Sequence, residues 1–83
     1  MKPSHVLRRA AQNLFERGAP LDADVLLFDA AIDLEQTRDK RAPGPVAVSI
    51  QYARLFTPPD CNGPDEQITA LLLAAEVAHS EGL

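Results

Sequence analysis

The side chains best suited to chemistry stand far apart in this chain of 83 residues. The two histidines, His5 and His79, lie near opposite ends, and the single cysteine, Cys61, lies in a stretch rich in proline and glycine. Zinc sites draw Cys and His ligands from closely spaced pairs, and no such pair occurs here. The neighbouring acids Asp60 and Asp65 disfavour a reactive thiolate at Cys61. We therefore expect no metal, no cofactor and no enzymatic activity.

Paired carboxylates are the second chemical candidate. Asp29 and Asp33 are four residues apart and would share one face of a helix. Such a pair can act in acid–base chemistry or bind a metal, but carboxylate sites in bundles add Glu-x-x-His motifs, which are absent here. With Asp22 these residues form what we call the acidic seam, a predicted contact surface for a basic partner. Arginines of the first segment are the alternative partners for these acids: Arg8, Arg9 and Arg17.

Nucleic-acid binding has weaker support. The four glycines stand singly, so the chain has no glycine-rich phosphate loop. Segments 22–36 and 46–56 make a poor helix-turn-helix, because their connection is longer than the turn of about three or four residues in that motif. The net charge of −4 also disfavours contact with phosphates. The cations left for nucleic acid lie in the connection: Arg38, Lys40 and Arg41.

The first helix that must position these side chains is predicted over 4–17. Apolar residues recur there at helical spacing, Ser4 is a suitable N-cap, and Gly18 follows the end. We expect one buried face, made of Val6, Leu7, Ala10, Ala11, Leu14 and Phe15. The solvent side is expected to hold Arg8, Arg9, Gln12, Asn13 and Glu16.

The second helix is predicted over 22–36, with Asp22 or Asp24 as its N-cap. Its apolar residues fall in two strips when they are placed on a helix. One strip comprises Leu21, Val25, Phe28 and Ile32, and the other comprises Leu27, Ala30, Ala31 and Leu34. A helix with apolar surface on two sides is expected at the centre of a bundle.

The third segment, 46–56, fits two structures. Val46, Val48 and Ile50 alternate as in a half-buried strand, whereas Val46, Ile50 and Ala53 have helical spacing behind Pro45. We favour a helix, because the chain has no second strand-like segment with which a strand could pair.

The last helix is predicted over 64–80, with Pro64 in its first turn and Gly82 just past its end. Its polar residues form a narrow stripe, so its apolar arc is wider than three other short helices easily cover. We therefore predict self-association as a homodimer through part of this arc: Leu71, Leu73, Ala74 and Val77.

Length and composition place these segments in one all-α domain over 1–83, a compact bundle of about four short helices. Small apolar side chains dominate, which suits close helix packing. One unpaired cysteine favours a reducing compartment, and neither a signal peptide nor a membrane-spanning apolar run is found. We expect a cytoplasmic protein without a membrane partner.

These features together predict a non-enzymatic protein–protein interaction module, which acts through the acidic seam and the surplus apolar faces of the second and last helices. A small acidic protein of this kind fits a phage- or prophage-encoded inhibitor of the anti-defence type, which occupies a basic surface of a host protein complex. An antitoxin-like or adaptor protein fits the same features. The alternative from another class is a small DNA-binding transcriptional regulator.

Overall fold

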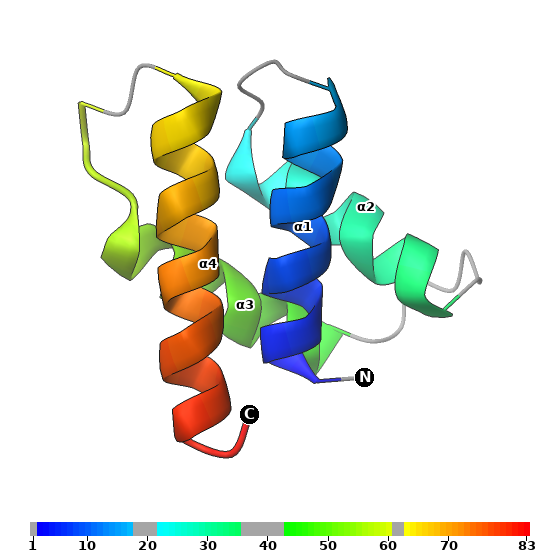
Figure 1. Cartoon of the computed structure of the whole chain (residues 1–83). Helices are drawn as coiled ribbons and strands as arrows, with labels where there is room; N and C mark the ends of the chain where they lie inside the picture. Colours follow the sequence, from blue (N-terminus) through cyan, green and yellow to red (C-terminus); the bar gives the residue numbers. More distant parts are fainter. Residues whose placement is uncertain (1, 18–21, 36–42, 61–62) are drawn as a thin grey trace.

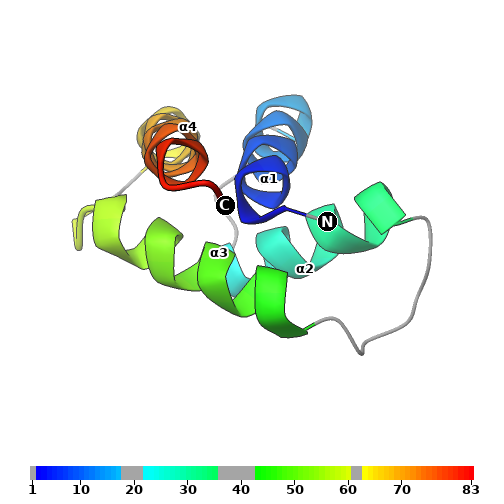
Figure 2. The same cartoon turned by 90° about the horizontal axis from the view of Figure 1, so that it is seen from below.

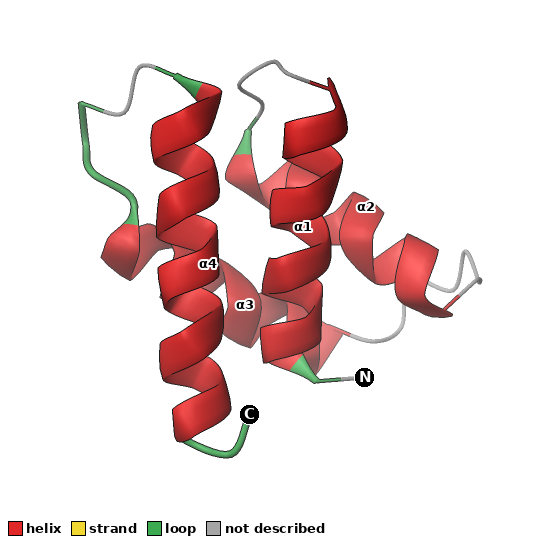
Figure 3. Ribbon diagram, in the orientation of Figure 1, coloured by secondary structure: helices red, strands yellow, loops and turns green. Residues whose placement is uncertain are grey.

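The computed structural model describes residues 2–17, 22–35, 43–60 and 63–83. These residues form four helices and no strand: α1 (Pro3–Arg17), α2 (Ala23–Glu35), α3 (Pro43–Phe56) and α4 (Pro64–Ser80) (Figure 3). The predicted all-α bundle is confirmed. The predicted helix ends agree closely with the observed ones, except that α3 begins three residues earlier than expected, at Pro43 rather than at 46.

The helices pack in two layers (Figures 1 and 2). The antiparallel helices α1 and α4 lie side by side in one layer, and α3 crosses beneath both of them while α2 lies beneath α1. Helices α1 and α3 each contact the three other described helices, whereas α2 contacts only α1 and α3. Helix α2 is therefore not central, and the expectation that it is central is wrong.

The core consists of leucines at the meeting point of the four helices, with alanines filling the closest approaches. Five leucines are completely or almost completely inaccessible to solvent: Leu7, Leu14, Leu26, Leu27 and Leu71. Small side chains let helix backbones approach closely, and six alanines of this core are fully buried: Ala10, Ala30, Ala53, Ala74, Ala75 and Ala78. The core therefore contacts one side of each helix, and the side chains on the outer side remain at the surface.

Segment 46–56 is helical, so the alternative of a strand is wrong. Val46 and Ala53 lie on the buried side of α3, with Ser49 fully buried between them. The Ser49 hydroxyl lies 2.7 Å from the carbonyl oxygen of Pro45 and 3.2 Å from that of Pro3. Prolines are tolerated in a first turn, where no intrahelical N–H bond is lost. Helix α3 can therefore begin at Pro43.

Ser4 and Gly82 were both predicted to lie at helix ends, and the structure confirms this only for Gly82. Ser4 is not the N-cap of α1, because the helix already begins at Pro3 and the Ser4 hydroxyl donates a hydrogen bond to the carbonyl oxygen of Leu83 (2.7 Å). Gly82 follows α4 as predicted, and its φ of 83° is the left-handed conformation that glycine adopts most easily. This turn lets the Leu83 amide donate to the carbonyl of Ala78 (2.9 Å).

The predicted faces of α1 need two corrections. Phe15, in the last turn of α1, is 76% exposed rather than buried. Asn13, expected on the solvent side, is only 6% exposed because it lies against α2. The remaining predicted face of α1 is buried: Val6, Leu7, Ala10, Ala11 and Leu14.

None of the described helices combines the length and the apolar character that crossing a bilayer requires.

The role of this core can be tested with one buried and one exposed leucine. Leu14→Ala removes side-chain contacts at the centre of the bundle and should lower the free energy of unfolding by about 2–5 kcal/mol. Leu55→Ala, at a largely exposed position of α3, should change it by no more than about 0.5 kcal/mol. Urea denaturation followed by circular dichroism measures both values, and equal losses in the two variants would contradict the observed packing.

Candidate functional site

An exposed apolar stripe runs along the outer side of α2. Val25, Phe28 and Ile32 are separated by three and four residues, so they share one helix face, and they remain 51%, 48% and 39% exposed. The opposite face of the helix is buried through Leu26, Leu27 and Ala30. We call Val25, Phe28 and Ile32 the exposed stripe. It belongs to one of the two apolar strips predicted for this helix, and no described helix covers it.

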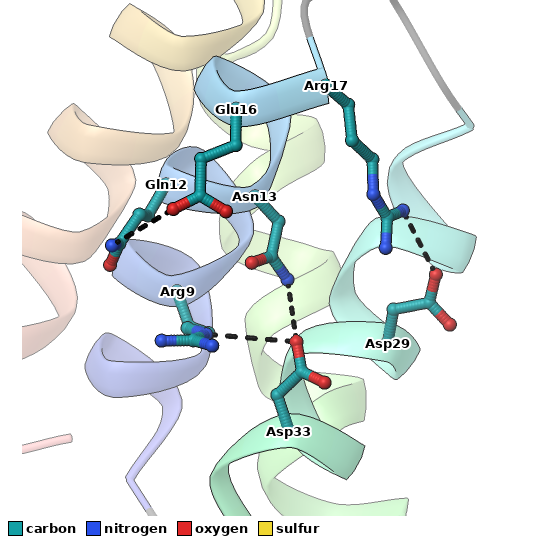
Figure 4. A network of polar contacts seen from close by, with 7 residues as sticks. All are labelled: Arg9, Gln12, Asn13, Glu16, Arg17, Asp29 and Asp33. Atoms are coloured by element: carbon teal, nitrogen blue, oxygen red, sulfur yellow. Dashed lines mark hydrogen bonds and ion pairs between the residues drawn. The ribbon is translucent and has the colours of Figure 1, made fainter.

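Asp29 and Asp33, beside the stripe on the α2 helix, form ion pairs with arginines of α1 (Figure 4). Nη1 of Arg17 lies 3.3 Å from Oδ2 of Asp29. One turn further along α2, Oδ2 of Asp33 lies 3.7 Å from Nε of Arg9. The side chains of both aspartates are about two-fifths exposed, so solvent and a partner can reach them. Arg9 and Arg17, two of the three arginines predicted to pair with the acidic seam, therefore do pair with it.

Asp33 also satisfies a buried polar group. Its Oδ2 accepts a hydrogen bond from the side-chain amide of Asn13 at 3.0 Å. Nε of Arg9 is buried as well and makes no hydrogen bond with the described residues, although it lies near the same carboxylate. A buried amide without a partner is costly. Asp33 therefore helps to dock α2 on α1, whereas the pair between Asp29 and Arg17 lies at the surface.

A third ion pair borders the stripe on the side of α3. Nη2 of Arg54 lies 3.1 Å and 3.4 Å from the two carboxylate oxygens of Asp24. At the start of α2, Oδ1 of Asp22 accepts a hydrogen bond from the backbone amide of Asp24 at 2.9 Å. Asp22 is thus the predicted N-cap of this helix. The three acids of the seam have three different roles, as cap, as surface ion pair and as anchor.

The pair of Asp24 and Arg54 was not predicted as part of a site. The sequence offers Asp24 only as a candidate N-cap, and no spacing pattern pairs it with Arg54. Their contact joins residues 30 positions apart in the sequence. It depends on how α2 and α3 cross, which the spacing within either helix does not reveal.

The predicted self-association surface on α4 needs correction. Leu71 and Ala74 are fully buried inside the bundle, against the other helices, and cannot contact a second copy in this conformation. Leu73 is 46% exposed, and Val77 is partly exposed. The arc of α4 is therefore mostly used by the chain's own core, because this helix packs on both α1 and α3.

The structure describes only some of the other chemical candidates. Arg38, Lys40, Arg41 and Cys61 lie outside the described residues. His5 and His79 are exposed on different helices. Among the described residues, no group of three or more His, Cys, Asp or Glu side chains is arranged to hold a metal ion.

Comparison with known proteins gives no match: no protein-family model fits the chain, and neither the curated proteins nor the solved structures contain one that matches it significantly.

Asp33 and Asp29 have different roles, so their removal should lower the free energy of unfolding by different amounts. Asp33→Ala leaves the buried amide of Asn13 without its acceptor and should cost about 1–3 kcal/mol of unfolding free energy. Asp29→Ala removes a surface ion pair and should cost at most about 1 kcal/mol. Asp33→Asn retains an oxygen that can accept from Asn13 and should recover most of the loss. Urea denaturation distinguishes these variants, and an Asp29→Ala loss equal to that of Asp33→Ala would refute the anchoring role.

Proposed function

We propose that this chain is a non-enzymatic protein–protein interaction module whose contact face is the exposed stripe of α2 with its bordering aspartates. The observation that carries the proposal is the placement of three large apolar side chains on one face of α2 between two carboxylates of the same helix, which pair with arginines of α1 and α3. Protein interfaces combine an apolar centre with a polar rim in this way.

The exposed stripe is contiguous, which distinguishes it from the scattered apolar residues that any protein surface holds. Elsewhere on the described surface, the large exposed apolar side chains are Phe15 on α1, Leu34 on another face of α2, Leu55 on α3, and Leu72 and Leu73 on α4. Adjacent residues such as Leu72 and Leu73 point about 100° apart around a helix. Only α2 presents three such residues in one row among the described elements.

The charge of the chain favours a basic partner. The net charge is −4, and residues 22–35 hold five acids and no base. A negative surface accelerates association with a positive one and disfavours acidic partners. Under this proposal the chain occupies a basic surface of another protein, in the cytoplasm, and a phage- or prophage-encoded inhibitor of the anti-defence type is the specific form that we propose. An antitoxin-like or adaptor protein would use the same contact.

The proposed partner is a different protein rather than a second copy. The homodimer was predicted from four residues of α4, and two of these, Leu71 and Ala74, are occupied by the core. Self-association is therefore an outcome for the experiments below to detect, and no part of the proposal depends on it.

Site-specific photo-crosslinking in the native cells tests the proposal. A photoreactive phenylalanine analogue placed at Phe28 should give one dominant adduct with a defined protein, because this position is at the centre of the face. The same analogue at Leu73, which has nearly the same exposure on α4, is the matched control and should give little of that adduct.

Charge variants refine this test. Asp24→Asn combined with Asp29→Asn removes two border charges but retains the anchor formed by Asp33 and Asn13. The adduct yield at Phe28 should fall in this variant and should also fall with added salt, since exposed charges are screened. Absence of an adduct at Phe28, or equal adducts from both positions, would contradict the proposed contact face.

A further inference from the structure

The dimensions of the exposed stripe match one helix of a partner. Val25 and Ile32 are seven residues apart, which on an α-helix is about 10 Å or two turns. Helices that dock in a groove or on a face contact it through residues at i, i+3 or i+4, and i+7. Val25, Phe28 and Ile32 have this spacing themselves. Two turns of a partner helix would cover them.

The apolar area of the stripe is too small for a stable contact between two folded faces. A half-exposed phenylalanine contributes on the order of 100 Å², since a whole aromatic side chain presents about 150–250 Å². The three side chains together therefore present a few hundred Å², within the usual size of about 300–600 Å² for the largest patch on a monomer. Stable interfaces bury about 800 Å² on each partner. A short segment docked reversibly fits this area better than a permanent dimer does.

The carboxylates on the two borders of the stripe indicate that the partner segment is basic. Asp29 lies on the side of α1 and Asp24 on the side of α3, so carboxylates flank the apolar row on both sides. Each is held in place by an arginine of this chain and remains about two-fifths exposed. Exposed ion pairs contribute only about 0–1 kcal/mol. A cation of a partner can therefore share or displace the arginine at little cost.

A second copy of this chain is a poorer occupant. Its own α2 would bring the same acid-rich segment, 22–35, against this one. Like charges across an interface disfavour association. Among the described residues, the arginines that contact this segment, Arg9, Arg17 and Arg54, pair with the aspartates of their own copy.

We propose that the exposed stripe of α2 receives one amphipathic helix of the partner, with apolar residues on Val25, Phe28 and Ile32 and with Lys or Arg on both of its borders. The cations of one border pair with Asp29, and those of the other pair with Asp24. This inference rests on the proposed function, because it specifies what occupies the same face. It adds that this helix carries cations on both of its borders, because a carboxylate lies on each side of the stripe.

Model peptides test the charge and the geometry with the purified full chain. The probe is a helical peptide of about five turns, built from Ala and Gln with Leu at i, i+3 or i+4, and i+7, and with Lys on both borders of the Leu row. Three matched peptides accompany it: one with Glu in place of every Lys, one with all Lys moved to a single border, and one of the same composition in scrambled order.

Two-dimensional NMR of the labelled protein locates binding, and titration calorimetry measures the dissociation constant. The peptide with Lys on both borders should shift amide signals of α2 most strongly and should bind at least about tenfold more tightly than each matched peptide, a difference of 1.4 kcal/mol. Phe28→Ser should weaken its binding about tenfold or more, and Leu73→Ser should not. Both substitutions are at exposed positions, and circular dichroism verifies that each variant remains folded.

Three results would overturn the inference. They are equal affinity for the Glu or single-border peptide, strongest shifts outside α2, and concentration-dependent self-association that Phe28→Ser abolishes, since this last result identifies a second copy as the occupant. The cellular test remains separate. A Phe28 adduct without peptide binding rejects the basic helix but supports the interaction module, whereas peptide binding without any cellular adduct supports the chemistry of the face but rejects the module.

Discussion

Burial of one side of α1 by the other three helices is the constraint on which the rest of this structure depends. Leu7 and Leu14 hold the centre of the contact, and the alanines of α4 let that helix approach α1 closely. Because α4 and α1 together occupy one layer, α2 is left to pack against α1 and α3 alone. Its inner face fills that space, and none of the other described helices lies over its outer face. The exposed stripe thus follows from how the core is assembled.

The polar contacts of α2 divide into those that hold the helix and those that remain available. The amide of Asn13 is buried and needs the carboxylate of Asp33, so this contact contributes to docking. The pairs of Asp29 with Arg17 and of Asp24 with Arg54 are exposed, and their contribution to stability is small. Evolution or engineering can therefore change the border charges of the proposed interface with little effect on folding.

The same division holds for the apolar residues of α2. Leu26, Leu27 and Ala30 are committed to the core, whereas Val25, Phe28 and Ile32 contribute little to it. A helix that stabilises the fold with one face and presents the other needs no conformational change before it binds. The face is already formed, which lowers the ordering cost of association. This economy suits a small domain, whose stability margin is narrow.

Helical periodicity in the sequence by itself determined the number of helices, most of their ends and the buried residues of α1, because these depend on neighbours three and four positions apart. It also showed that α2 has two apolar strips and that its acids can pair with arginines of α1. Only the tertiary structure decided that Leu26, which belongs to neither predicted strip of α2, is buried whereas Leu34 is exposed. It also decided that Leu71 and Ala74 belong to the core and that Asn13 and Arg54 meet acids of α2. The physical reason is that the spacing of apolar residues is similar in every amphipathic helix and does not identify the helix that each face contacts. That contact depends on how helices distant in sequence cross.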